Sequence, residues 1–156
     1  MTKFLLSVHV IAAILAIGPV AVAASMFPPA ARRALATGPG DDAGHGDGDP
    51  TGTLRLLHRI CRVYAVVGVV VPVFGFATAS EMGVLGSAWL IVSIALTALA
   101  ALVLAALVLP AQSALLEGSA GAGRAARLGM VTGLFNLLWA AVTVLMIVRP
   151  GSTTGA

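Results

Sequence analysis

The sequence predicts an all-α fold, a four-helix bundle that spans a membrane with both termini on the extracytoplasmic side. Of its 156 residues, 59% are hydrophobic and 10% are charged, whereas a soluble domain uses about 25% charged residues. The apolar residues gather in four long runs, and the nine basic residues flank these runs. This pattern excludes a soluble enzyme and a basic nucleic-acid-binding patch, and it favours one membrane domain over residues 1–156.

Each apolar run is long enough for a membrane-spanning helix, which needs about 20 residues to cross about 30 Å of hydrocarbon. Helices are predicted because an open sheet cannot satisfy its backbone polar groups in lipid. Gly18-Pro19 interrupts the first helix and Pro72 the second, while Arg149-Pro150 closes the last. The predicted helices cover residues 4–27, 54–79, 83–109 and 128–148.

The connections between the predicted helices differ in character. Residues 28–53 are rich in Gly, Pro and Asp, a composition that predicts a flexible loop. Within it, Asp47-Gly-Asp49 superficially resembles a calcium-binding loop, but the position that should hold a bidentate Glu is His58. A tight turn is predicted at Ser80-Glu81-Met82, and a segment rich in small residues over 111–126.

The distribution of Lys and Arg predicts the orientation in the membrane. Seven of the nine basic residues lie in or beside the first and third connections, which places these connections in the cytoplasm and both termini outside. The alternative is a cleaved secretory signal that ends at Ala21-Val22-Ala23. A retained helix is favoured, because the apolar stretch exceeds the roughly 7–15 residues of a signal core and cleavage would leave Arg32 and Arg33 outside.

His9 is the candidate for a cofactor ligand. It lies in the first predicted helix, where ionisable residues are rare and often functional, and imidazole is a common axial ligand of haem. The alternative is a side chain that hydrogen-bonds a neighbouring helix. Because His58 belongs to the opposite membrane face, a second group beside His9 must come from the outer ends of the other helices. The candidates there are Glu81, Met82, Ser93 and Met146.

His58 and Cys61 lie three residues apart on one helix face, but no second pair completes a four-ligand metal site. The neighbouring arginines predict the interfacial start of a helix that contacts anionic lipid. The sequence therefore predicts no metal-ligating residue and no catalytic residue.

Small residues form stripes on the last two predicted helices. Such stripes let membrane helices pack closely. Asn136 lies near mid-membrane and is expected to hydrogen-bond another helix. The first stripe contains Ser93, Thr97, Ala101 and Ala105, and the second contains Gly129, Gly133, Asn136, Ala140 and Thr143. Gly129, Gly133 and Asn136 are the predicted helix-packing residues.

The first helix carries a family resemblance. The run Phe4-Leu-Leu-Ser-Val-His9-Val-Ile-Ala-Ala, with Gly18-Pro19 and Ser25-Met-Phe-Pro28, resembles small bacterial membrane proteins of domain-of-unknown-function family 2269. The segment around His9 is distantly similar to HemJ-type protoporphyrinogen oxidases and the CopD copper-resistance group. The HemJ-type resemblance implies haem b or porphyrin at His9. However, Ser93 stands where those oxidases carry a Lys, and no Met-rich or Cys/His cluster supports the copper handling that CopD implies.

The predicted function is that of a multi-pass protein of the bacterial plasma membrane, an accessory or structural subunit without catalytic activity. Its expected partners are the lipid bilayer and either a larger membrane complex or further copies of the chain, with no nucleic acid. The alternative is a haem- or porphyrin-binding bundle with His9 as the axial ligand. A transporter is disfavoured, because residues 4–27 and 83–109 contain no acidic side chain.

Overall fold

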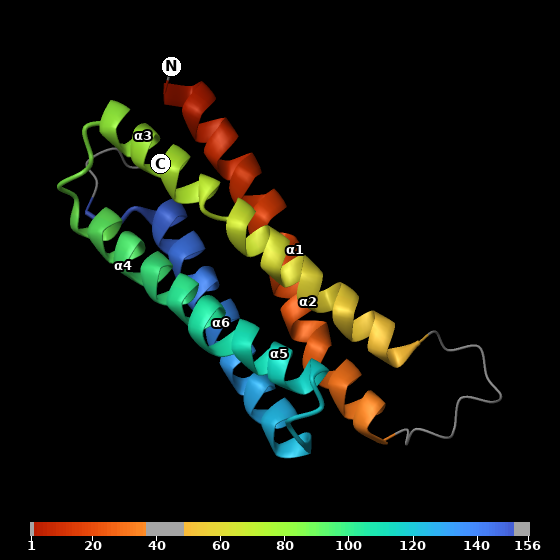
Figure 1. The fold of residues 1–156 in the computed structure, drawn as a ribbon. Coiled ribbons are helices and arrows are strands. Elements are labelled where there is room, and N and C mark those ends of the chain that lie inside the picture. Colours follow the sequence, from red (N-terminus) through yellow and green to blue (C-terminus); the bar gives the residue numbers. More distant parts are fainter. Residues whose placement is uncertain (1, 37–48, 152–156) are drawn as a thin grey trace.

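The computed structural model describes residues 2–36 and 49–151, and the regular elements in these ranges are all helical (Figure 1). Four of the helical stretches are long and apolar enough to cross a membrane. The predicted all-α fold with four membrane-spanning helices is therefore confirmed. The elements are α1 (Thr2–Ala36), α2 (Pro50–Val67), α3 (Val70–Glu81), α4 (Ala88–Leu102), a π-helical turn η1 (Val103–Val108), α5 (Leu109–Leu116) and α6 (Ala122–Val148).

Helix α1 continues to Ala36, well beyond the predicted end at residue 27. It passes through Pro28 and Pro29, which lack the N–H that an interior helical residue donates. Packing compensates for the lost bonds, since Phe27 and Ala31 are buried in the core and Pro28 lies against Gly129 of α6. The predicted loop over 28–53 is thus helical at both flanks, and its central residues 37–48 lie outside the described residues.

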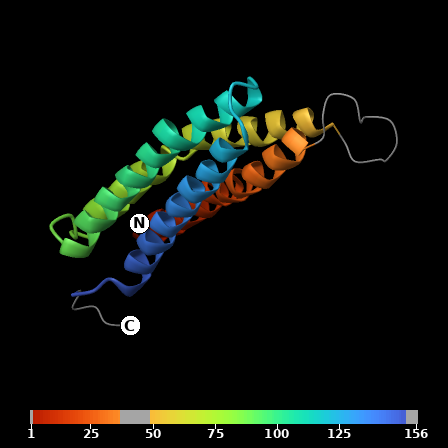
Figure 2. The same cartoon turned by 90° about the horizontal axis from the view of Figure 1, so that it is seen from below.

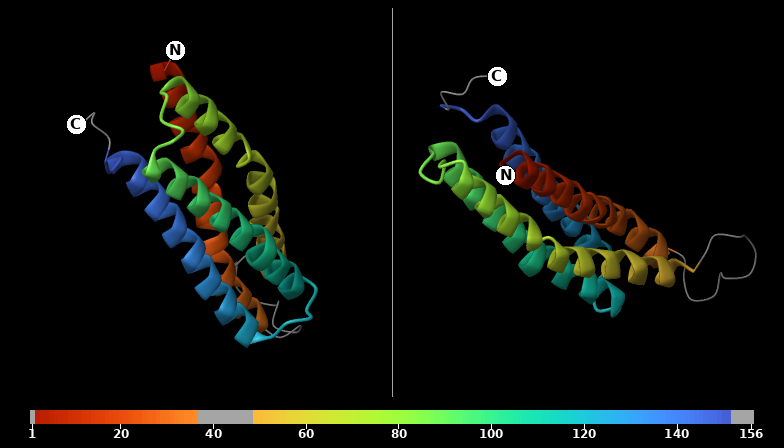
Figure 3. Two further views of the ribbon diagram at one scale, coloured as in Figure 1. Left: turned by 90° about the vertical axis from the view of Figure 1, so that its left-hand side faces the viewer. Right: turned by 90° about the horizontal axis from the view of Figure 1, so that it is seen from above.

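The second predicted helix, 54–79, is divided into α2 and α3 at Gly68-Val69. Pro72 has no N–H to offer to the carbonyl of Gly68, four residues earlier. The N–H of Val71 serves that carbonyl instead, at 3.2 Å. The resulting change of direction between α2 and α3 is visible in the left panel of Figure 3.

The third span begins five residues later than predicted and ends seven residues later, covering Ala88–Leu116 in place of 83–109. The π-helical turn η1 lies in its middle, directly before Leu109-Pro110. Pro110 cannot donate to the carbonyl four residues earlier, and a π-turn re-routes the backbone bonds at such a point. The predicted connection 111–126 shrinks to residues 117–121, because Gln112 and Leu115 are buried in the bundle.

The helices form an elongated bundle and run along a common direction (Figure 2). Helix α1 packs against α2, α3 and α6, while α4 and η1 pack against α6, and α5 returns to α2. One end of the bundle holds Thr2, the α3–α4 turn and the end of α6 (Figures 1 and 3). We name the opposite end the arginine end, because it holds the end of α1 and the starts of α2 and α6, with Arg32, Arg33, Arg55, Arg59, Arg62, Arg124 and Arg127.

Candidate functional site

A polar network joins α2 to α5 at the arginine end. His58 Nδ1 lies 3.0 Å from Gln112 Oε1, and Gln112 Nε2 donates to Cys61 Sγ at 3.5 Å. Gln112 is fully buried. Because its amide nitrogen faces Cys61, its oxygen is the atom that faces His58, so Nδ1 of the imidazole carries the hydrogen. In the neutral ring, Nε2 is then left as a hydrogen-bond acceptor.

Ser113 lies on the other side of the His58 ring. Its Oγ is 3.5 Å from His58 Nε2 and donates to the carbonyl of Leu109 at 3.2 Å. A hydroxyl has one hydrogen, so Ser113 cannot donate to both acceptors at once. While it serves Leu109, the Nε2 lone pair remains available to another donor.

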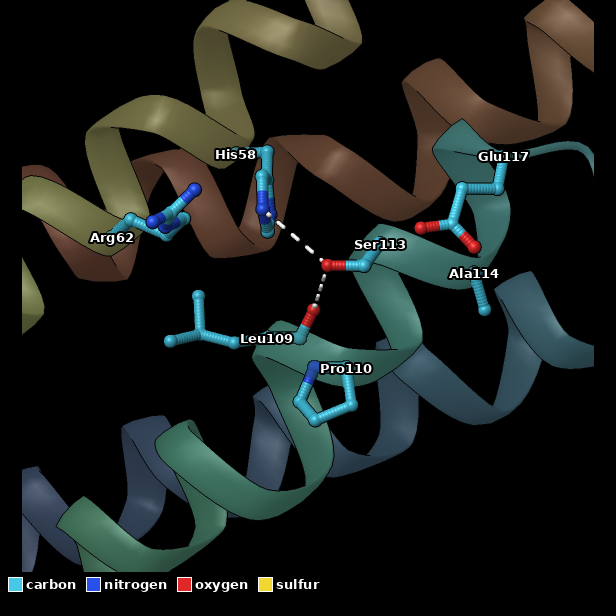
Figure 4. A pocket seen from close by; sticks show the side chains of 7 residues that line it. All are labelled: His58, Arg62, Leu109, Pro110, Ser113, Ala114 and Glu117. Carbon is cyan, nitrogen blue, oxygen red and sulfur yellow. Dashed lines mark hydrogen bonds between the residues drawn. The ribbon is translucent and has the colours of Figure 1, made fainter.

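A pocket of about 470 Å³ opens beside this network. Figure 4 shows Arg62 and Glu117 on opposite sides of the His58–Ser113 contact. Both side chains are exposed, and neither forms an ion pair with any residue in the described ranges. The pocket therefore presents a cation and a carboxylate, neither of them ion-paired within the described part of the chain, beside an acceptor nitrogen. Its lining consists of His58, Arg62, Leu109, Pro110, Ser113, Ala114 and Glu117.

Sequence reasoning placed His58 and Cys61 on one helix face but missed Gln112, which links them. The available signal was a polar Gln112-Ser113 pair just beyond the apolar run that ends at residue 109. The sequence predicts a connection over 111–126, but this pair lies in α5. The calcium-like motif has a different outcome: Asp49 caps α2 by accepting from the N–H of Thr51 at 3.0 Å, while Asp47 lies outside the described residues.

His9 lies between α1 and α3. Its Nδ1 is 3.1 Å from the carbonyl oxygen of Val71, and because a carbonyl can only accept, Nδ1 carries the hydrogen. The ring rests on Gly75, where an added Cβ would lie 2.8 Å from His9 Cε1. Gly75 is thus the residue that lets the two helices and the ring approach so closely.

Of the four candidates named to accompany His9, Ser93 and Met146 belong to other contacts. Ser93 is buried and donates to the Trp89 carbonyl of its own helix at 2.8 Å. Met146 packs against the small cluster of Ala79, Trp89 and Leu90. Within the described residues, neither side chain hydrogen-bonds His9, and His9 lines neither of the two described cavities.

The predicted packing residues on α6 divide into two groups. Gly129 lies against Pro28 of α1, where an added Cβ would be 3.7 Å from the proline Cβ, and Asn136 Nδ2 donates to Ser25 Oγ at 2.9 Å. Gly133 is exposed, and an added Cβ would meet no atom within 4 Å. Two residues of the stripe therefore contact α1, whereas Gly133 faces out of the bundle.

Comparison with known protein families, with curated proteins and with solved structures finds no significant match. The resemblance to family 2269 and to HemJ-type and CopD proteins stays a prediction.

Proposed function

We propose that this protein is a non-catalytic subunit of a bacterial plasma membrane that assembles with other membrane helices through α6. The observation that carries the proposal is Gly133. A glycine inside a helix costs about 1 kcal/mol relative to Ala, and among residues 2–36 and 49–151 no atom lies within 4 Å of a Cβ added at Gly133. Small residues of this kind let a second membrane helix approach closely.

The residues around Gly133 form a continuous outward face. They alternate in spacing between three and four residues, the pattern by which two helices pack along a left-handed seam. Met130, Leu137 and Ile147 are 78%, 70% and 75% exposed. We name as the α6 face the exposed residues Met130, Gly133, Leu137, Ala140, Val144 and Ile147.

The polar side chains of the spans support a structural role. His9, His58 and Asn136 each hydrogen-bond a residue on a different helix. Inside a membrane such bonds hold helices together, with a typical contribution of about 0.6–2 kcal/mol each. These three polar side chains therefore contribute to the stability of the bundle.

The orientation that accompanies this proposal places the arginine end in the cytoplasm and both termini outside. Seven of the nine basic residues gather at that end, with Lys3 and Arg149 at the other, and basic residues concentrate on the cytoplasmic side of membrane proteins. The bacterial plasma membrane is proposed on the resemblance to family 2269.

Substitution of Gly133 by Leu tests the assembly. Position 133 is exposed and an added Cβ meets no atom of the described residues within 4 Å, so helicity measured by circular dichroism should match the wild type. A partner helix on the α6 face would be displaced, and we expect the association constant to fall about tenfold or more, which is about 1.4 kcal/mol. The measurement is the native mass of the complex in mild detergent and in native-membrane nanodiscs.

Gly18→Leu is the matched control, because Gly18 is also an exposed intramembrane glycine with no atom within 4 Å of an added Cβ. It should leave the native mass unchanged. A wild-type protein that is monomeric in every detergent and in nanodiscs would refute the proposal, as would a Gly133→Leu variant that keeps the wild-type mass.

A second candidate function is haem b or porphyrin binding at His9, and one observation favours it. The Nδ1–H bond to the Val71 carbonyl holds the ring and leaves Nε2 unprotonated, as metal-ligating histidines do. The donor chemistry thus fits an axial ligand. In this packing the ring rests on Gly75, and His9 lines neither of the two described cavities.

An absorption spectrum of protein purified from haem-supplied cells decides this second candidate. Haem ligated by His9 gives a Soret band that disappears in His9→Ala and persists in His58→Ala, because His58 lies at the opposite end of the bundle. A colourless wild-type protein, or a band that survives in His9→Ala, leaves His9 as a packing residue.

A further inference from the structure

The pocket at the arginine end lies at the level of the bilayer interface. Between Arg62 and Glu81, the α2–α3 segment contains 18 residues without formal charge, which span about 27 Å at 1.5 Å per residue. On α6 the uncharged stretch 128–148 contains 21 residues and spans about 31 Å. Both match the roughly 30 Å hydrocarbon core, so Arg62 and Arg127 mark one boundary of this core.

The pocket is amphipathic, as a phospholipid is. Leu109, Pro110 and Ala114 supply an apolar wall next to the hydrocarbon, while Arg62 and Glu117 supply opposite charges. Its volume of about 470 Å³ falls in the common range of small-molecule sites, about 300–1,000 Å³.

The polar groups favour a zwitterion over a simple anion. Arg62 offers the planar fork of donors that matches a phosphate. Glu117 is an acceptor without an ion pair in the described residues, and it would repel a second negative charge. The Gln112 bond leaves His58 Nε2 as an acceptor, so this nitrogen also suits a donor such as an ammonium group.

We propose that this pocket binds one phospholipid with a phosphoethanolamine headgroup. Its phosphate lies on Arg62 and its ammonium group on Glu117 and His58 Nε2, with the acyl chains leaving along Leu109, Pro110 and Ala114. The inference requires that the helices span a membrane, and it is independent of assembly through the α6 face. It narrows the expected contact with anionic lipid, because the Glu117 carboxylate attracts an ammonium group and repels a headgroup with a net negative charge.

Native mass spectrometry of delipidated protein tests the site. The protein is exposed to phosphatidylethanolamine, phosphatidylcholine and phosphatidylglycerol that carry identical acyl chains. We expect one phosphatidylethanolamine to be retained at least about fivefold better than the other two, since the trimethylated ammonium of choline cannot donate a hydrogen bond and glycerol carries no cation. Equal retention of the three lipids would overturn the proposal.

Charge-removing variants locate the site. Glu117→Gln should lower phosphatidylethanolamine retention to the level of phosphatidylglycerol, and Arg62→Gln should weaken binding of all three lipids. Arg59→Gln and Glu81→Gln are matched controls, because both side chains are exposed and neither lines the pocket. If the two pocket variants behave as these controls do, the lipid binds elsewhere and the assignment is wrong.

A competition arm separates a membrane lipid from a soluble molecule of the same chemistry. Free phosphoethanolamine at the lipid concentration should displace less than a tenth of the bound lipid, because it makes no contact with the apolar wall. Displacement of half or more would overturn the lipid assignment in favour of a soluble phosphoethanolamine ligand. Inorganic phosphate serves as the second competitor, and strong displacement by it alone would show that Glu117 and His58 contribute nothing.

Discussion

Gln112→Leu is expected to lower the free energy of unfolding by about 2–3 kcal/mol. The new side chain approximates the volume of the old one, so packing is largely kept. It removes the acceptor of His58 Nδ1 and the donor to Cys61 Sγ. A buried polar group that loses its partner costs about 1–3 kcal/mol, and the half-buried His58 ring would then face an apolar side chain at the fully buried position 112. The measurement is reversible unfolding in mixed micelles, followed by helicity.

A double-mutant cycle separates the lost bond from a change in packing. When His58 and Gln112 are both replaced by Leu, only the weak acceptor Cys61 Sγ still loses its partner, and replacing both members of a bonded pair by apolar groups is often nearly neutral. We therefore expect the double variant to lose about 1–2 kcal/mol less free energy of unfolding than the two single variants lose in sum. Additive losses would mean that the His58–Gln112 bond contributes no coupling. Ser113→Ala removes the long 3.5 Å contact to the ring and the 3.2 Å bond to the Leu109 carbonyl of its own helix, and it leaves the His58–Gln112 bond in place, so it should cost less than Gln112→Leu.

The membrane spans were predictable because they depend on two coarse quantities, hydropathy and length. Each of the four apolar runs is one helical stretch, formed by a single helix in the first and last spans, by α2 and α3 in the second, and by α4, η1 and α5 in the third. The ends were less predictable, because tertiary packing decides them. Pro28 and Pro29 suggested the end of the first helix, yet Phe27 and Ala31 are buried on either side and carry α1 onward.

The network at the arginine end could not be predicted from local sequence. His58 and Gln112 are 54 residues apart, and their meeting depends on the length of η1 and α5. The π-helical turn before Pro110 shifts the register of α5 relative to a plain α-helix. Hydropathy carries no information about such a shift. By contrast, the sequence offers a hydrogen bond from His9 to a neighbouring helix as one of two alternatives. The structure adds the identity of the partners, Val71 and Gly75.

Three glycine-to-alanine substitutions should change the free energy of unfolding in different directions. At Gly133 an added Cβ meets no atom of the described residues within 4 Å, and at Gly129 it makes ordinary contact with Pro28 at 3.7 Å, so alanine should stabilise the helix by up to about 1 kcal/mol at Gly133 and by less at Gly129. At Gly75 the new methyl group would lie 2.8 Å from His9 Cε1 and 3.2 Å from Nδ1. The ring has to move and the bond to the Val71 carbonyl is lost, so a net destabilisation of about 1–2 kcal/mol is expected after the gain in helix propensity.

Removal of the His9 ring should rescue Gly75→Ala. In the background of His9→Ala, the methyl group at position 75 meets no imidazole, so the substitution should become neutral or stabilising, as at Gly133. The unfolding midpoints of the four proteins in this cycle measure the coupling, which we expect to be about 1–2 kcal/mol. If Gly75→Ala destabilises the protein equally with and without the ring, the contact between His9 and Gly75 does not set the spacing of α1 and α3. In that case the destabilisation caused by Gly75→Ala has to come from a contact other than the one with the His9 ring.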